Sequence, residues 1–214
     1  CAIWNRLRQI FEEREIPYNV LFTKGTGHVT RAVAKLTAPD DSGRKKLPIK
    51  LIILGGDGTM NEALQGIHDF SKVLLGYIPT GSSNDLARDL QLPKDPAVIL
   101  QTILEGKYVR SMDLGLLTYT DVSEESAMPG DIHASSQRFF AVSSGIGFDA
   151  AVCEEANSSR FKKLLNKLKL GKLTYLAVAL RQLIAAKSVS CDIYLDDDKS
   201  PIHIKRFLFT AFMI

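Results

Sequence analysis

Apolar residues in the first half of the chain follow two alternating patterns. The segments with apolar residues at helical spacing are 2–15, 28–36, 60–70, 84–92 and 95–107. Between them lie short apolar runs typical of strands, at 18–23, 48–55 and 72–81. Because helices alternate with strands apolar enough to be covered on both faces, the first half predicts a parallel sheet wrapped by helices.

The second half has a different pattern. Its strand-like runs are 109–120, 138–145, 188–197 and 202–214. A polar stretch at 121–136 predicts a surface loop, and residues 148–187 are mostly helix-like. Since strands here follow strands, we expect an antiparallel or mixed arrangement.

We therefore predict an α/β fold with two domains. The first is a parallel-sheet α/β domain at residues 1–108, and the second is a β-rich domain at 109–214 with a helical insert at 148–187. The chain begins on a helix-like segment, whereas α/β units commonly begin on a strand, and it stops within the apolar run FLFTAFMI. We expect the fold to be incomplete at both ends of the chain.

Composition and charge change this picture little. The chain has 214 residues and a net charge of +3, which is too mild to favour nucleic acid but permits an anionic ligand or membrane surface. Cys1, Cys153 and Cys191 are widely spaced without metal-type spacing, as is typical of reduced thiols. No apolar run is long enough to cross a bilayer, and no signal peptide precedes the first helix-like segment. These features predict a cytoplasmic protein with no nucleic-acid partner.

The sequence GGDGT at residues 55–59 follows the apolar run LIIL and opens a helix-like segment. Gly55, Gly56 and Gly58 lack side chains, so backbone amides can approach an anion closely. The helix that follows from Met60 directs its free N–H groups and positive dipole end toward the same point. Both features favour a phosphate site.

Asp57 and Thr59 add side-chain oxygen atoms to this loop. The hydroxyl of Thr59 can donate a hydrogen bond to a phosphate. A carboxylate beside a phosphate repels it, so Asp57 suggests that Mg²⁺ lies between them, since proteins commonly hold Mg²⁺ with one or two carboxylates plus substrate oxygens. The alternative is a tight turn in which Asp57 or Thr59 caps the helix.

A second loop, GYIPTGSSNDLAR at residues 76–88, again joins a strand-like run to a helix-like one. One interpretation places the hydroxyl of Ser82 on a phosphate and Asp85 near the metal. In the other, Ser82 and Asp85 form a capping box at the start of the helix.

Together, GGDGTMNEAL and IPTGSSNDLAR resemble the catalytic domain of the diacylglycerol kinase family, and most of all its bacterial lipid kinase branch. That family shares a superfamily with sphingosine kinases, NAD kinases and phosphofructokinases. Weaker matches are MDLG at 112–115, GIGFDAAV at 145–152 and GKLTYL at 171–176. The resemblance implies an ATP- and Mg²⁺-dependent kinase that phosphorylates a lipid hydroxyl, with diacylglycerol as the expected substrate. It also implies a sandwich-like second domain and an ATP site between the two domains.

The resemblance also assigns residues by position. Asp57 and Asp85 would hold Mg²⁺, and Asp57 would be the catalytic residue. The nucleotide-binding positions would be Thr23, Gly55, Gly56, Asp57, Gly58, Thr59, Met60, Asn61 and Ser82. Family members usually carry threonine at the position of Ser82, and serine keeps the hydroxyl. The family's first strand with its Asn-Pro loop, and its glycine-rich segment with the carboxylate that deprotonates the lipid, have no counterpart in this sequence.

Two other functions stay open on the sequence alone. NAD kinases also carry GGDGT, although the pair Asn61 and Glu62 and the PTGSSND loop favour a lipid kinase. A nucleotide-binding regulatory protein without turnover also fits, because the segment with the base has no counterpart in this sequence.

A basic segment at residues 160–172, RFKKLLNKLKLGK, interleaves cations with leucines. The preferred interpretation is a helix with a solvated basic face. The alternative is contact with anionic lipid, which would bring the protein to the inner face of the membrane. In both cases the resemblance implies a lipid substrate at the membrane surface.

Overall fold

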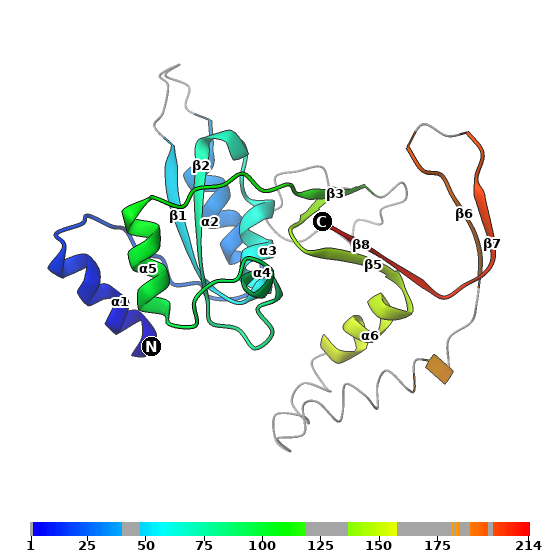
Figure 1. Ribbon diagram of the computed structural model, residues 1–214, viewed down its shortest axis with the longest axis horizontal. Coiled ribbons are helices and arrows are strands. Elements are labelled where there is room, and N and C mark those ends of the chain that lie inside the picture. Colours follow the sequence, from blue (N-terminus) through cyan, green and yellow to red (C-terminus); the bar gives the residue numbers. More distant parts are fainter. Residues whose placement is uncertain are drawn as a thin grey trace. The chain divides into compact units, whose positions relative to one another are not determined.

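The computed structural model of the protein describes residues 2–39, 48–118, 137–157, 181, 183–184, 189–196 and 199–214 (Figure 1). Contacts divide the chain into two compact units, Cys1–Val142 together with Ile214, and Ser143–Met213. The boundary near residue 108 stays a prediction. The loop expected at 121–136 lies outside the described residues, as do the basic segment at 160–172 and most of the helix expected at 160–187.

The described residues of the first unit form helices, a short 3-10 turn and four strands. In chain order these elements are α1 (Ala2–Glu13), α2 (His28–Thr37), β1 (Ile49–Gly55), α3 (Asp57–Gln65), η1 (Phe70–Lys72), β2 (Val73–Pro79), α4 (Asp85–Asp89), α5 (Pro96–Glu105), β3 (Gly115–Thr118) and β4 (Gln137–Phe140). The predicted alternation of helices and strands is confirmed for most of these elements. Among the described residues, no helix is both long enough and apolar enough to cross a bilayer.

Strands β1 and β2 pair in parallel, from Ile49 opposite Val73 to Gly55 opposite Pro79. The side chains of successive residues point to opposite faces of this pair. Ile53 and Tyr77 lie in one buried cluster with residues of α2, α3 and α4. Ile78 lies in a second cluster with residues of α1 and α5, and Figure 1 shows these two helices beside the strand pair. The helices therefore cover both faces, which explains why both strands are apolar throughout.

One predicted strand is wrong. The segment 18–23 forms no strand, and the side chains of Leu21 and Phe22 are 55% and 63% exposed. The rings of Tyr18 and Phe22 instead pack edge-on against Trp4 of α1, with centroids 5.8 and 6.1 Å away. An apolar run indicates extended backbone, but a strand also needs a neighbouring strand to bond.

The described part of the second unit consists of short antiparallel strand pairs and the helix α6. Its elements are β5 (Ser143–Gly147), α6 (Phe148–Asn157), β6 (Val189–Ile193), β7 (Ile202–Phe207) and β8 (Phe209–Met213). β5 pairs with β8 and β6 pairs with β7, in both cases antiparallel. The run predicted as one strand at 202–214 is thus two strands with different partners. The α/β class, with a parallel pair first and antiparallel strands later, is confirmed.

Candidate nucleotide site

The two glycine loops touch each other through their backbones. They follow β1 and β2, whose ends lie side by side because Gly55 is paired with Pro79. The N–H of Thr80 donates a hydrogen bond of 2.8 Å to the carbonyl of Gly55. A Cβ atom added to Gly81 would lie only 2.7 Å from the Cα of Gly56. Glycine is therefore required at this contact, and the sequence supplies it in both loops.

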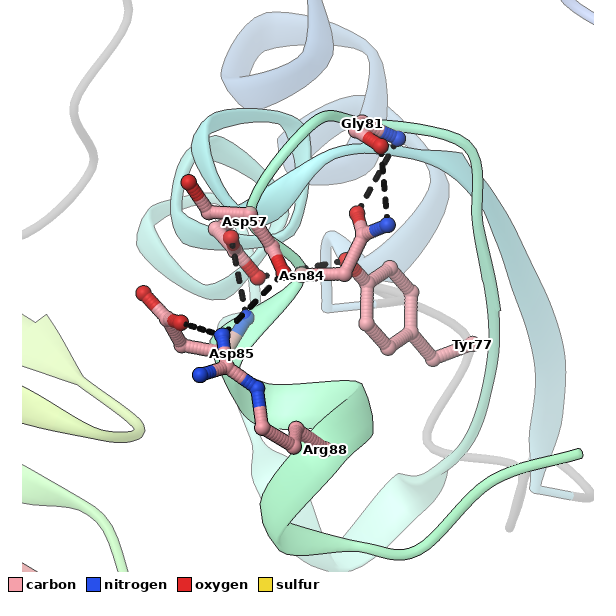
Figure 2. Close-up of polar contacts among 7 residues, drawn as sticks. Asp57, Tyr77, Gly81, Asn84, Asp85 and Arg88 are labelled. Carbon is pink, nitrogen blue, oxygen red and sulfur yellow. Dashed lines mark hydrogen bonds and ion pairs between the residues drawn. The ribbon is translucent and has the colours of Figure 1, made fainter. Parts of the chain in front are cut away.

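Asp57 is the first residue of α3, and its carboxylate faces the second loop (Figure 2). One carboxylate oxygen, Oδ1, accepts a hydrogen bond of 3.3 Å from the hydroxyl of Tyr77. The other, Oδ2, accepts one of 3.2 Å from the backbone N–H of Asp85. The N-cap of α3 is Gly56, without a side-chain cap. Asp57 therefore does not cap its own helix and instead joins the two loops.

Tyr77 is buried, with 6% of its surface exposed. Burial, together with the negative charge of Asp57 and the hydrogen bond to it, raises the pKa of Tyr77 to about 12. The hydroxyl therefore keeps its proton at neutral pH and acts as a donor to the carboxylate. The sequence interpretation missed this residue because Tyr77 fits the apolar pattern of β2.

Asn84 shapes the second loop. Its backbone has left-handed angles, φ 52° and ψ 51°, which asparagine tolerates better than most residues. Its side-chain Oδ1 accepts from the N–H of Gly81 at 3.0 Å, and its Nδ2 donates to the carbonyl of Gly81 at 2.8 Å. Asn84 is the N-cap of α4. The alternative in which Ser82 begins a capping box is therefore wrong, because Ser82 lies before the cap position.

Asp85 pairs with a cation on its own helix. Nη2 of Arg88 lies against Oδ1 of Asp85, and it also donates a hydrogen bond of 3.3 Å to the carbonyl of Ser83 (Figure 2). The side chains of Arg88 and Asp85 are 70% and 54% exposed, so solvent screens this pair. Arg88 therefore places a positive charge beside the negative charge of Asp85 at the second loop.

The segment that begins at Thr23 is tied to α3. The N–H of Gly27, a residue with φ 74°, donates a hydrogen bond of 3.0 Å to the carboxylate of Glu62. The hydroxyl of Thr30 donates to the backbone carbonyl of Glu62 at 2.9 Å. A shallow pocket here is lined by Lys24, Gly25, Thr26, His28 and Arg31. The structure thus ties the segment that follows Thr23 to the helix that carries Asp57, and the predicted contact of Thr23 with nucleotide stays a prediction.

Asn61 and Gln65 direct their side chains from α3 to β4. Asn61 donates to the carbonyl of Phe139 at 3.3 Å and accepts from Nη2 of Arg138 at 3.3 Å. Gln65 bonds both backbone groups of Phe139, with its Nε2 2.9 Å from the carbonyl and its Oε1 3.0 Å from the N–H. In this structure Asn61 therefore contacts β4, and its predicted contact with nucleotide stays a prediction.

The donor set near the loops fits Mg²⁺ that arrives with a nucleotide. Within the described part of the chain, no three or more His, Cys, Asp or Glu side chains gather as a self-sufficient metal site. Asp57 and Asp85 are adjacent through the hydrogen bond described above. One or two carboxylates plus phosphate oxygens are a common set of ligands for Mg²⁺. The carboxylate of Asp57 therefore suits Mg²⁺ bound to phosphate, whereas the carboxylate of Asp85 pairs with Arg88 and its contact with Mg²⁺ stays a prediction.

The fold and these loops define an α/β domain of the kind that holds phosphate between strand ends and helix N-termini. The family described as "Diacylglycerol kinase catalytic domain" matches residues 1–117, and the chain belongs to that family. The resemblance drawn from the two loops is thereby confirmed.

Individual relatives agree with this assignment. The Bacillus subtilis (strain 168) protein named "Putative lipid kinase YtlR" is 22% identical over 201 residues, which are 94% of this chain and 60% of that protein. The "Diacylglycerol kinase" of Staphylococcus carnosus (strain TM300) is 34% identical over 114 residues, 50% of this chain and 37% of that protein.

A solved structure supports the fold. The crystal structure of "a putative diacylglycerol kinase from Bacillus anthracis str. Sterne" has a TM-score of 0.63 at 20% identity, covering 98% of this chain and 59% of that one. The chain therefore spans about three fifths or less of the length of these relatives.

Proposed function

We propose that this chain is the nucleotide-binding part of an ATP- and Mg²⁺-dependent lipid kinase, with diacylglycerol as its substrate. The observation that carries the proposal is the position of Asp57, at the N-terminus of α3 and bonded to the second glycine loop. Helix N-termini and glycine loops bind phosphate, and a carboxylate at the same place suits a phosphate-bound cation.

In this proposal the chain's own residues bind and orient the nucleotide. Backbone amides of the loop from Gly55 to Asn61 and the hydroxyl of Ser82 donate to the phosphates, and the segment at Thr23 contacts the nucleotide beside them. Asp57 and Asp85 would hold Mg²⁺, which neutralises charge on the phosphates when it is bound. Catalysis then rests on positioning and charge neutralisation. We assign no residue of this chain to removing the proton from the lipid hydroxyl.

The membership of the family favours a lipid acceptor over NAD. We further propose that the protein works in the cytoplasm, at the inner face of the membrane, because a diacylglycerol substrate resides in the bilayer.

A lipid panel tests the acceptor directly: the intact protein is incubated with labelled ATP and diacylglycerol, a sphingoid base, phosphatidylglycerol or NAD. Labelled phosphatidic acid is the expected product. Label in NAD phosphate, or ATP binding without any product, would instead support one of the alternative functions.

The role of Asp57 is tested by the substitution Asp57→Asn in the intact protein. Asparagine keeps an acceptor for the N–H of Asp85 and tolerates turn geometry, so the fold is expected to persist. Loss of the charge is expected to reduce turnover at least about 100-fold and to abolish the dependence of ATP binding on Mg²⁺. Asp89→Asn, which removes the same charge at the exposed end of α4, is the matched control. Normal turnover in a folded Asp57→Asn protein would contradict the proposal.

A further inference from the structure

Tyr77 has a polar hydroxyl at a buried position that an apolar ring, such as that of phenylalanine, would also fill. It lies in β2 opposite Ile53 of β1, within the buried cluster that also holds Met60 and Leu86. A buried hydroxyl is unfavourable unless it finds a hydrogen-bond partner. The hydroxyl of Tyr77 donates to Oδ1 of Asp57, so the one polar atom of this side chain is directed at the candidate metal carboxylate (Figure 2).

The ring gives that hydroxyl a fixed direction. A tyrosine side chain has only two rotatable bonds before its ring, and packing in a dense core restricts both. The strand that holds Tyr77 is paired in register with the strand that leads into Asp57. The distance between the hydroxyl and the carboxylate is therefore set by the sheet, whereas a loop residue would leave it variable.

The two donors to Asp57 act on different oxygens and come from different elements. Tyr77 of β2 donates to Oδ1, and the backbone of Asp85 at the start of α4 donates to Oδ2. Rotation of the carboxylate about its Cβ–Cγ bond would break both hydrogen bonds together. Each oxygen has a second lone pair, which these two donors leave available to a cation.

We propose that Tyr77 is a positioning residue that holds the carboxylate of Asp57 in the orientation that binds phosphate-bound Mg²⁺. This inference rests on the proposed function, because both assign phosphate-bound Mg²⁺ as the ligand of Asp57. It adds a residue that acts through Asp57 and touches neither nucleotide nor lipid. The hydroxyl of Tyr77 has two opposing effects on Mg²⁺ affinity. It withdraws negative charge from the carboxylate of Asp57, which weakens Mg²⁺ binding, and it fixes the carboxylate in place, which strengthens binding. The second effect is the larger one.

The substitution Tyr77→Phe removes the hydroxyl and keeps the ring that packs in the core. ATP binding to the intact protein is measured by calorimetry over a series of Mg²⁺ concentrations, with thermal unfolding and turnover measured in parallel. We expect the Mg²⁺ concentration for half-maximal effect to rise about 3- to 10-fold, as for the loss of one hydrogen bond. ATP binding without Mg²⁺ is expected to stay the same. Tyr108→Phe, at a ring that is 82% exposed, is the matched control.

A double substitution separates positioning from a general loss of stability. In the Asp57→Asn background, where ATP binding is expected to be independent of Mg²⁺, Tyr77→Phe is expected to cause no further change in ATP binding at any Mg²⁺ concentration, because the carboxylate that it positions is gone. If Tyr77→Phe lowers only the unfolding temperature, or tightens Mg²⁺ binding, the positioning role is overturned and the proposed function stands. If Asp57→Asn itself leaves Mg²⁺ dependence intact, both the proposed function and the role of Tyr77 are overturned.

Discussion

Gln65 is expected to be the most sensitive polar residue in the first unit outside the glycine loops. Its side chain is 1% exposed, and it bonds the N–H and the carbonyl of Phe139, a residue far along the chain. Phe139 lies opposite Leu116 in the antiparallel pair of β3 and β4. Residues of such pairs alternate in whether their backbone groups face the partner strand, and those of Phe139 face Gln65. The side chain thus takes the place of a neighbouring strand.

The substitution Gln65→Met keeps the length of the side chain and removes its polar atoms. The N–H of Phe139 loses its bond to Gln65, whereas the carbonyl keeps the bond of 3.3 Å from Asn61. A buried backbone group without its partner costs about 1–3 kcal/mol, and each further lost hydrogen bond about 1 kcal/mol. We therefore expect the free energy of unfolding to fall by about 2–4 kcal/mol. Gln101→Met, at an exposed position of α5, is expected to change it by less than about 0.5 kcal/mol.

Two measurements check this prediction in the intact protein. Urea unfolding reports the global free energy, and a constant m-value shows that the unfolded state is unchanged. Hydrogen exchange at the amide of Phe139 reports local opening of β4 from α3, which can occur without global unfolding. If the midpoint and the protection of Phe139 both match the wild type, the inference that Gln65 anchors β4 is wrong.

Two further predictions concern charge. Hydrogen bonding to Arg6 and to the N–H of Ala97 holds the pKa of Asp95 below its ordinary value, so its contribution to stability is present above the unfolded pKa of about 4 and is lost as the pH falls through the folded value. Asp95→Asn keeps a helix cap, so it is expected to be less stable than the wild type at pH 7. The two proteins are expected to converge in acid unfolding curves once the pH lies below the folded pKa of Asp95, and a difference that persists there would contradict this. Reversing Lys162, Lys163 and Lys167 to Glu is expected to weaken binding to anionic vesicles in a sedimentation assay without changing ATP affinity. Unchanged vesicle binding would reduce segment 160–172 to a solvated helix.

The sequence predicted the elements whose pattern depends on burial. β1 and β2 are apolar on both faces because helices cover both faces. Burial on both faces produces an uninterrupted run of apolar residues, which can be recognised in the sequence. It predicted 18–23 wrongly, because an apolar run does not reveal whether another strand lies beside it. It also placed the start of α3 at Met60, although the helix begins at Asp57, since Gly56 serves as the cap without a capping side chain.

The sequence was sufficient to predict the motifs of the candidate site, but it did not predict the contacts between their residues. GGDGT and PTGSSND carry glycines, and the contact between Gly56 and Gly81 requires the absence of a Cβ atom, since neither residue has a positive φ. The link from Asp57 to Tyr77 depends on the register of β1 with β2, which no local pattern specifies. Gln65 gave no signal either, because a single polar residue in a helical segment is ordinary. Asn84 gave a partial signal: an asparagine directly before a helix is a common N-cap residue, and Asn84 does stand at the N-cap of α4, but its side chain bonds Gly81 and not the helix.

The register of β1 with β2 also restricts how this chain can change in length. An inserted residue in either strand would displace its loop by about 3.3 Å relative to the other loop and turn the following side chains to the opposite face. The backbone contact between Gly56 and Gly81, where an added Cβ would already approach to 2.7 Å, has no room for such a shift. Insertions and deletions that preserve the site are therefore excluded from the two strands and their loops, unless both strands change equally, and are accommodated in connections outside them, such as the one at 66–72 between α3 and β2. Among diverged copies of this gene, the spacing within each strand and its loop should be constant while that connection varies in length.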